Sequence, residues 1–140
     1  MQTATTALAQ QATWKDWSGR IASALVVLFL TIDGVSKLMQ IAPVVEASAR
    51  LGYPDGVTGG IGIVVLVCAA LYAIPRTAVI GAILLTGLLG GAIASHVRIG
   101  SPMFTHVLFG AYVGALAWGA LWLRDERLRA LFPLRRHQSR

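Results

Sequence analysis

Four apolar segments, each about twenty residues long, constrain the fold of this chain more than any other feature. They cover residues 18–39, 58–74, 77–97 and 104–123. A helix that rises about 1.5 Å per residue needs about twenty apolar residues to cross about 30 Å of hydrocarbon. Only 13% of the 140 residues are charged, about half the proportion usual in a soluble domain. We therefore predict an all-α membrane protein, a four-transmembrane-helix bundle.

The stretches outside the apolar segments complete the predicted organisation. Residues 1–17 are rich in Ala, Thr and Gln and are expected to form a flexible or interfacial N-terminal arm. Residues 18–124 then form the transmembrane domain, and residues 125–140 form a basic tail. Between the first two apolar segments, Pro43 suits the first turn of an amphipathic stretch within residues 40–57. This stretch is predicted to be a short interfacial helix.

Basic residues are distributed unevenly between the two ends of the predicted bundle. With four spans, the arm, the turn at Arg76 and the tail share one side, which carries nine of the twelve Lys and Arg residues. Lys37, Arg50 and Arg98 lie on the opposite side. Cytoplasmic segments are enriched in Lys and Arg, so both termini are expected in the cytoplasm. The same rule accounts for the net charge of +6, and no nucleic-acid partner is expected.

A cleavable signal peptide is the alternative interpretation of the first segment. The triplet Ala47-Ser48-Ala49 resembles a cleavage site, but it follows the apolar run at 24–30 by well over ten residues. Signal peptides are cut close behind their apolar region. We therefore expect the first segment to be retained as a membrane span.

Asp33 lies well inside the first apolar segment and is the strongest candidate for a functional side chain. A charge near mid-membrane costs about 2.5–3.5 kcal/mol, so such residues usually face the bundle interior. Lys37 is one helical turn further on and can pair with it. The topology places His96, at the end of the third segment, and His106, at the start of the fourth, at a similar depth. Asp33, Lys37, His96 and His106 are therefore the candidate catalytic cluster, because acid, base and imidazole together can transfer protons.

Each of these residues also has a plain structural interpretation. Lys37 and the two histidines lie near an interface, where polar side chains are common, and Asp33 can serve in a salt bridge or an interhelical hydrogen bond. The single cysteine, Cys68, excludes an internal disulfide, and two histidines with one acid do not predict a metal site. The familiar motifs of hydrolases, dinucleotide-binding proteins and c-type cytochromes are absent from the sequence. Haem b, which needs one or two histidines, stays open.

Small residues recur four positions apart in the later segments, as at Gly87 and Gly91 and at Gly110 and Gly114. This spacing lets helix backbones approach closely in lipid. It favours either packing within the bundle or a homo-oligomer, and the pattern does not separate the two.

A set of short sequence blocks, taken in order, resembles the DoxX-like family of small bacterial integral membrane proteins. The blocks are DGVSKL at 33–38, LGYP at 51–54, IPRT at 74–77 and GGAIASHVR at 90–98. The resemblance extends over about residues 18–134. It implies a four-helix membrane bundle in the bacterial inner membrane, which agrees with the span count.

The resemblance also implies a range of roles. The wider group looks to include a small subunit of thiosulfate:quinone oxidoreductase, a methylamine-utilisation membrane protein and a receptor-assembly chaperone. The chain departs from some relatives: residues 61–71 contain no acid, and Gly110 stands where a proline is common. With Cys68 alone, thiol–disulfide chemistry is not supported, so a redox role would rest on bound quinone, on haem b or on a partner.

Two functions follow from these observations. The first is an accessory or quinone-linked redox-associated membrane subunit, with the lipid bilayer and a membrane or redox subunit as partners. The second is an intramembrane enzyme that carries out isomerase-type or oxidoreductase-type acid–base chemistry on a lipophilic small molecule through Asp33 and His96.

Overall fold

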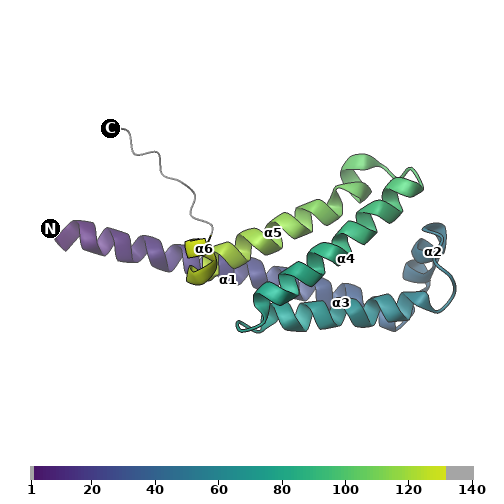
Figure 1. Ribbon diagram of the computed structural model, residues 1–140, viewed down its shortest axis with the longest axis horizontal. Coiled ribbons are helices and arrows are strands. Elements are labelled where there is room, and N and C mark those ends of the chain that lie inside the picture. The colour runs from purple at the N-terminus through teal and green to yellow at the C-terminus, as the bar shows by residue number, and fades with distance from the viewer. Residues whose placement is uncertain (1, 132–140) are drawn as a thin grey trace.

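A computed structural model describes residues 2–131, with side chains described from Trp14 onward, and in this range the chain forms helices joined by turns and no strands. Seven helical elements follow one another (Figure 1): α1 Gln2–Leu38, α2 Ala42–Arg50, α3 Val57–Ala73, α4 Ala78–Arg98, η1 Met103–Val107, α5 Phe109–Arg124 and α6 Glu126–Leu131. The predicted all-α class is confirmed. The C-terminal part of the predicted tail, residues 132–140, lies outside the described residues.

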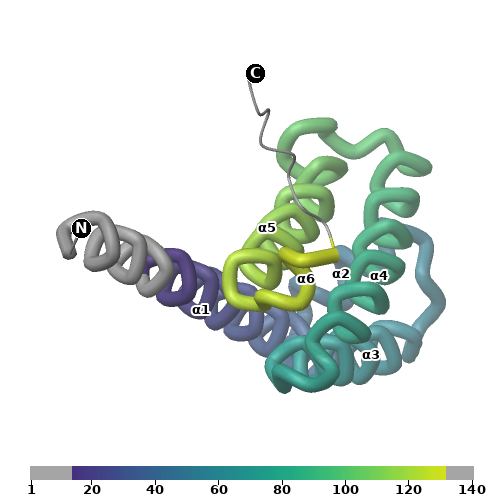
Figure 2. The backbone as a smooth tube through the Cα atoms, turned by 60° about the vertical axis from the view of Figure 1, so that its left-hand side comes forward, coloured from purple at the N-terminus to yellow at the C-terminus, as the bar shows by residue number. Residues whose placement is uncertain are grey.

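The four long helices pack in a ring in which each contacts two others. Helix α1 contacts α3 and α5, and α4 contacts the same two helices from the other side. Figure 2 shows this arrangement, with α6 crossing the end of α5. The segments Trp14–Leu38, Ala78–Arg98 and Met103–Arg124 are long and apolar enough to cross a membrane. Helix α3 is apolar but has 17 residues, so the count of four membrane spans stays a prediction.

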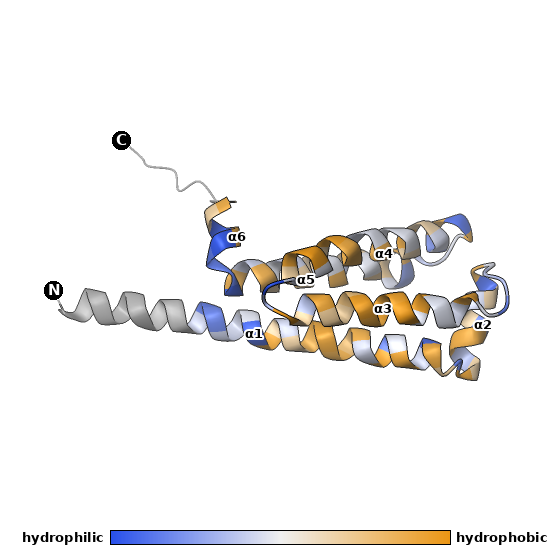
Figure 3. Cartoon of the chain, turned by 60° about the horizontal axis from the view of Figure 1, so that its bottom comes forward, coloured by the Kyte–Doolittle hydropathy of each residue, from blue (hydrophilic) through white to orange (hydrophobic). Residues whose placement is uncertain are grey.

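Large apolar side chains cover the outside of the bundle as well as its interior. Leu25, Leu28, Ile63, Ile80 and Ile83 are all more than half exposed, and in Figure 3 α3 is largely orange while α1, α4 and α5 carry orange stretches on their outer faces. A helix that is apolar on all sides is typical of a membrane environment, because in water its outer face would remain unburied. The exposed surface therefore suits contact with lipid.

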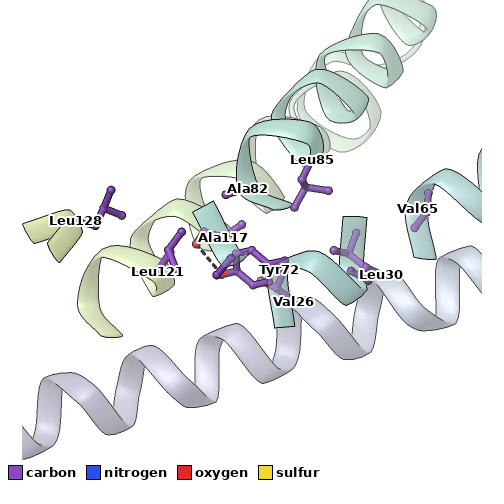
Figure 4. Close-up of a cluster of buried hydrophobic side chains, with 11 residues drawn as sticks. Val26, Leu30, Val65, Tyr72, Ala82, Leu85, Ala117, Leu121 and Leu128 are labelled. Atoms are coloured by element: carbon purple, nitrogen blue, oxygen red, sulfur yellow. Dashed lines mark hydrogen bonds between the residues drawn. The ribbon is translucent and has the colours of Figure 1, made fainter. Parts of the chain in front are cut away.

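Tyr72 is the centre of the buried core and is completely inaccessible to solvent. It packs among Val26 and Leu30 of α1, Leu85 of α4 and Leu121 of α5 (Figure 4). Its hydroxyl donates a 2.7 Å hydrogen bond to the carbonyl oxygen of Ala117 and lies 3.4 Å from the hydroxyl of Ser23. A buried tyrosine needs such a partner for its polar end. This one links α3 to α5 across the core.

The helix boundaries agree with the sequence to within two residues in the middle of the chain. The predicted segments 58–74 and 77–97 correspond to α3 and α4, because Pro75 in the turn between them interrupts the helix. Helix α2 begins with Pro43 in its first turn, as predicted, and its interfacial position stays a prediction. The predicted arm, residues 1–17, is continuous with α1 from Gln2 onward; its flexible or interfacial character stays a prediction.

The start of the fourth segment differs from the expected α-helix. Met103–Val107 form a π-helical turn, in which the amide of Leu108 donates to the carbonyl of Met103, 2.9 Å away. Apolar periodicity does not distinguish this wider turn from an α-helix, so the pattern did not predict it. π-helical turns are rare in proteins, and those that occur are often found at functional sites. This one carries His106.

Candidate functional site

Asp33 and Lys37 form an ion pair within the last two turns of α1. The pair has i,i+4 spacing, which places both side chains on one face of the helix. The Asp33 and Lys37 side chains are 32% and 22% exposed. A β-carbon placed on Gly62 of α3 would lie 2.9 Å from the Lys37 Cβ. The pair therefore lies at the α1–α3 contact, and its two charges compensate each other locally.

His96 and His106 face each other at the same end of the bundle. Their ring centroids are 5.6 Å apart, because the turn between α4 and η1 returns the chain on itself. His96 Nδ1 lies 3.0 Å from the Ser101 hydroxyl, and His106 Nδ1 lies 2.9 Å from the Thr105 hydroxyl. His96 is half-buried and His106 is exposed. Each imidazole therefore has a hydroxyl partner within five positions of it in the chain.

The four candidate residues form two pairs. Across residues 14–131, no hydrogen bond or ion pair connects Asp33 or Lys37 to His96 or His106. No three His, Cys, Asp or Glu side chains in the described part of the chain are placed to hold a metal ion. The arrangement supports one salt bridge and one histidine pair. Transfer of a proton between the pairs would need a bridging group.

Two further contacts organise this end of the bundle, and sequence reasoning did not identify either. The Tyr53 hydroxyl lies 2.7 Å from the Ser95 hydroxyl, and the Arg98 guanidinium donates to the carbonyl oxygen of Leu51. Together they fasten the α2–α3 connection to the end of α4. The blocks LGYP and SHVR contain all four residues, but their contact joins positions more than forty residues apart in the chain.

The polar groups around this connection enclose a cavity of about 240 Å³. Gln40, Ser48, Tyr53, Asp55 and Thr58 contribute to its wall. A quinone or haem needs a mainly apolar pocket with a few polar groups. This cavity is smaller and more polar than such a pocket, and large side chains such as Tyr72 and Leu85 fill the core between the helices. Neither cofactor fits this cavity, whose wall does not include His96 or His106.

Comparison with known proteins identifies a family. Residues 21–120, which run from α1 into α5, match the DoxX-like family. Neither the curated proteins nor the solved structures contain a match to this sequence. The matched region covers more than half of the chain and includes Asp33, Lys37, His96 and His106. The chain therefore belongs to the DoxX-like family.

Proposed function

We propose that this multi-pass membrane protein is an accessory subunit that supports a partner membrane protein and has no chemistry of its own. The observation that carries the proposal is the state of the four candidate residues. Asp33 pairs with Lys37 one turn away, and each histidine has a hydroxyl partner close to it in the chain. Catalysis by proton transfer requires an acid and a base that meet on one substrate. Two separate, locally satisfied pairs suit a structural role better.

The proposed partner is another membrane protein. Apolar side chains cover the outer faces of α1, α3, α4 and α5, and such faces can pack against lipid or against the helices of a second protein. The wider DoxX-like group looks to include a small subunit of thiosulfate:quinone oxidoreductase, and this favours a quinone-linked redox enzyme as that partner. In that case the quinone would be held by the partner, because the cavity at the α2–α3 connection does not suit it.

Native purification tests the accessory role. The tagged chain is extracted from its host with a mild detergent after brief cross-linking, and its cross-linked species are identified by mass spectrometry. We expect one membrane protein to be recovered in a fixed ratio to the chain. A matched preparation carrying an unrelated four-helix membrane protein controls for non-specific recovery. Repeated isolation of the chain alone would contradict the proposal.

The proposed topology has four spans, with both termini in the cytoplasm of a bacterial cell. Helix α3 is about 26 Å long at about 1.5 Å per residue, packs against α1 and α4, and is joined to α4 by the short turn at residues 74–77. A helix held alongside two spans in this way crosses the same layer. Arg20, Arg76 and Arg124 lie together at one end of the bundle, which supports a cytoplasmic position for that end.

Cysteine labelling tests this topology. In a Cys68→Ala background, Asp55→Cys is expected to react with a membrane-impermeant maleimide in intact cells, because the α2–α3 connection would face outward. Arg76→Cys is expected to react only after the cells are permeabilised. Both positions are exposed on the bundle, so access to the reagent depends on the side of the membrane. The reverse pattern, or equal labelling in intact cells, would contradict the topology.

The intramembrane-enzyme alternative is favoured by the approach of His96 to His106. Asp33→Asn and His96→Ala separate it from the accessory role. We expect both variants to retain partner recovery and to shift the melting temperature only slightly, because Lys37 lies in the last turn of α1 and its long side chain can reach the interface when Asp33 is replaced. Thermal melting in detergent, partner recovery and host growth are measured in parallel. Loss of host function with folding and partner binding intact would support the enzyme instead.

A further inference from the structure

A basic cavity of about 490 Å³ lies at the end of the bundle opposite the histidine pair. Four arginines contribute to it, and each comes from a different element: α1, the α3–α4 turn, α5 and α6. They are Arg20, Arg76, Arg124 and Arg127. Four cations from four elements converge here only because the helix ends meet. The cavity is therefore a product of the fold.

The two carboxylates at this cavity have other contacts. Asp125 accepts hydrogen bonds from the backbone amides of Arg127 and Leu128, at 2.9 Å and 3.3 Å, and so caps the start of α6. Glu126 is 87% exposed and lies 3.5 Å from Arg129, which is outside the cavity lining. Among residues 14–131, no ion pair involves any of the four arginines of the wall. The cavity therefore keeps a positive charge.

Arg124 adds a donor that lacks an acceptor. One terminal nitrogen of its guanidinium donates to the carbonyl oxygen of Tyr72 at 2.8 Å, and its central carbon lies 5.1 Å from the centre of the Tyr72 ring. Its Nε is buried and has no hydrogen-bond partner in the described part of the chain. Leaving a buried donor unpaired is costly, particularly on a charged group. An anion in the cavity could supply the missing acceptor.

The position of the cavity limits the choice of anion. Pro75, Ala78 and Leu121 form an apolar part of its wall beside the arginines. If α1, α4 and α5 cross the membrane as proposed above, this end of the bundle lies at the depth of lipid headgroups. Guanidinium groups bind phosphate oxygens strongly because their paired N–H groups match the phosphate geometry. Basic pockets between membrane helices on the cytoplasmic side are suited to acidic lipids.

We propose that this cavity binds the phosphate group of an anionic phospholipid. The arginines hold the headgroup phosphate, and the acyl chains extend along the apolar side of the bundle. The assignment rests on the proposed membrane orientation but not on the accessory role. The lipid would join α1, the α3–α4 turn and α6 at the end where the helices converge.

Lipid titration of the purified full-length chain in detergent tests this proposal. Phosphatidylglycerol, phosphatidylcholine and inorganic phosphate are added separately, and bound lipid is measured by native mass spectrometry together with the melting temperature. We expect phosphatidylglycerol to remain bound and to raise the melting temperature, while the other two have little effect. In Arg76→Gln/Arg127→Gln, the dissociation constant for phosphatidylglycerol should rise about tenfold or more.

The charge-matched control is Lys15→Gln/Arg50→Gln, which removes two exposed cations that do not line the cavity. We expect this control to bind phosphatidylglycerol as the unmodified chain does. Equal weakening in both double variants would show non-specific attraction and overturn the site. Equal binding of phosphatidylcholine would overturn the requirement for an anionic lipid. Stabilisation by inorganic phosphate alone would overturn the lipid assignment. The titration needs no partner subunit. A negative result would therefore contradict the lipid site alone, whereas the accessory role is tested by the native purification.

Discussion

Gly81→Ala is expected to destabilise the bundle more than the same substitution at any other glycine of the four long helices. A β-carbon at this position would lie 2.3 Å from the backbone nitrogen of Tyr72, 2.7 Å from its Cα and 2.8 Å from the carbonyl carbon of Leu71. These are backbone atoms of α3, so no side-chain rotation can relieve the overlap. Helices α3 and α4 would have to separate beside Tyr72, the most buried side chain of the core. The strain should cost about 3 kcal/mol.

Thermal melting in detergent, followed by tryptophan fluorescence, measures this effect. We expect Gly81→Ala to lower the melting temperature by about 10 °C. Gly87→Ala is the matched control on the same helix, because a β-carbon there meets no atom within 4 Å in the described part of the chain. Alanine also favours the helix by up to about 1 kcal/mol relative to glycine, so the control should melt at or above the original temperature. Equal melting of the two variants would show that the α3–α4 contact is looser than described.

The helix positions were predictable because they depend on local properties of the sequence. Apolar length and Pro75 place α3 and α4 to within two residues. The Asp33–Lys37 contact was predictable for a similar reason, since residues four apart on a helix are neighbours. The approach of His96 to His106 follows from two antiparallel helices joined by a short turn. Each inference needs one helix or one turn, without knowledge of how the helices are arranged around the core.

The packing faces were less predictable. The four-residue spacing favoured close packing at Gly87 and Gly91, yet in the described chain a β-carbon at either position meets nothing within 4 Å. Of the predicted positions, Gly110 does lie close to a neighbour, since a β-carbon there would be 2.9 Å from the Ile93 side chain of α4. The other close approaches lie at glycines that the spacing did not single out as packing positions: Gly19 against α5, Gly34 and Gly81 against α3, and Gly62 against α1. A helix that is apolar on every side has no polar face to show which way it points. The sequence therefore shows where backbones can approach, but not which of those positions face a neighbour.

Contacts between segments far apart in the chain could not be predicted from the sequence either. Tyr53 and Ser95 are 42 positions apart, and Arg124 and Tyr72 are 52 apart. Such contacts depend on which helix ends meet, and that is set by the ring order of the four long helices. The same order separates the candidate residues: Asp33 and Lys37 lie at the contact of α1 with α3, whereas His96 and His106 lie between α4 and η1. The end of the bundle at which these residues lie was predictable, and their position around the bundle was not.

Arg124→Met is expected to produce the second large loss of stability. The last carbonyl groups of a helix have no hydrogen-bond donor within the helix. At the end of α3, side chains from outside the helix donate to them. The Thr77 hydroxyl donates to the carbonyl of Leu71 at 2.8 Å, and the Arg124 guanidinium donates to the carbonyl of Tyr72 at 2.8 Å. Methionine fills similar space without a donor. An unpaired carbonyl at a helix end costs about 1–3 kcal/mol, and loss of the cation–π contact adds about 0.5–1 kcal/mol.

Arg127→Met serves as the control, because it removes an arginine from the same cavity without a side-chain contact to a helix end in the described residues. In detergent free of anionic lipid, we expect Arg124→Met to melt about 10 °C below the unmodified chain and Arg127→Met to melt within a few degrees of it. Arg124→Lys should fall between, since an ammonium can donate to the carbonyl but lacks the planar group that lies over the Tyr72 ring. If Arg124→Met and Arg127→Met melted at the same temperature, the Tyr72 carbonyl at the end of α3 would have a hydrogen-bond donor other than Arg124. We expect the loss of melting temperature to increase from Arg127→Met to Arg124→Lys to Arg124→Met. That order would show that Arg124 both provides the hydrogen-bond donor at the end of α3 and links α3 to α5.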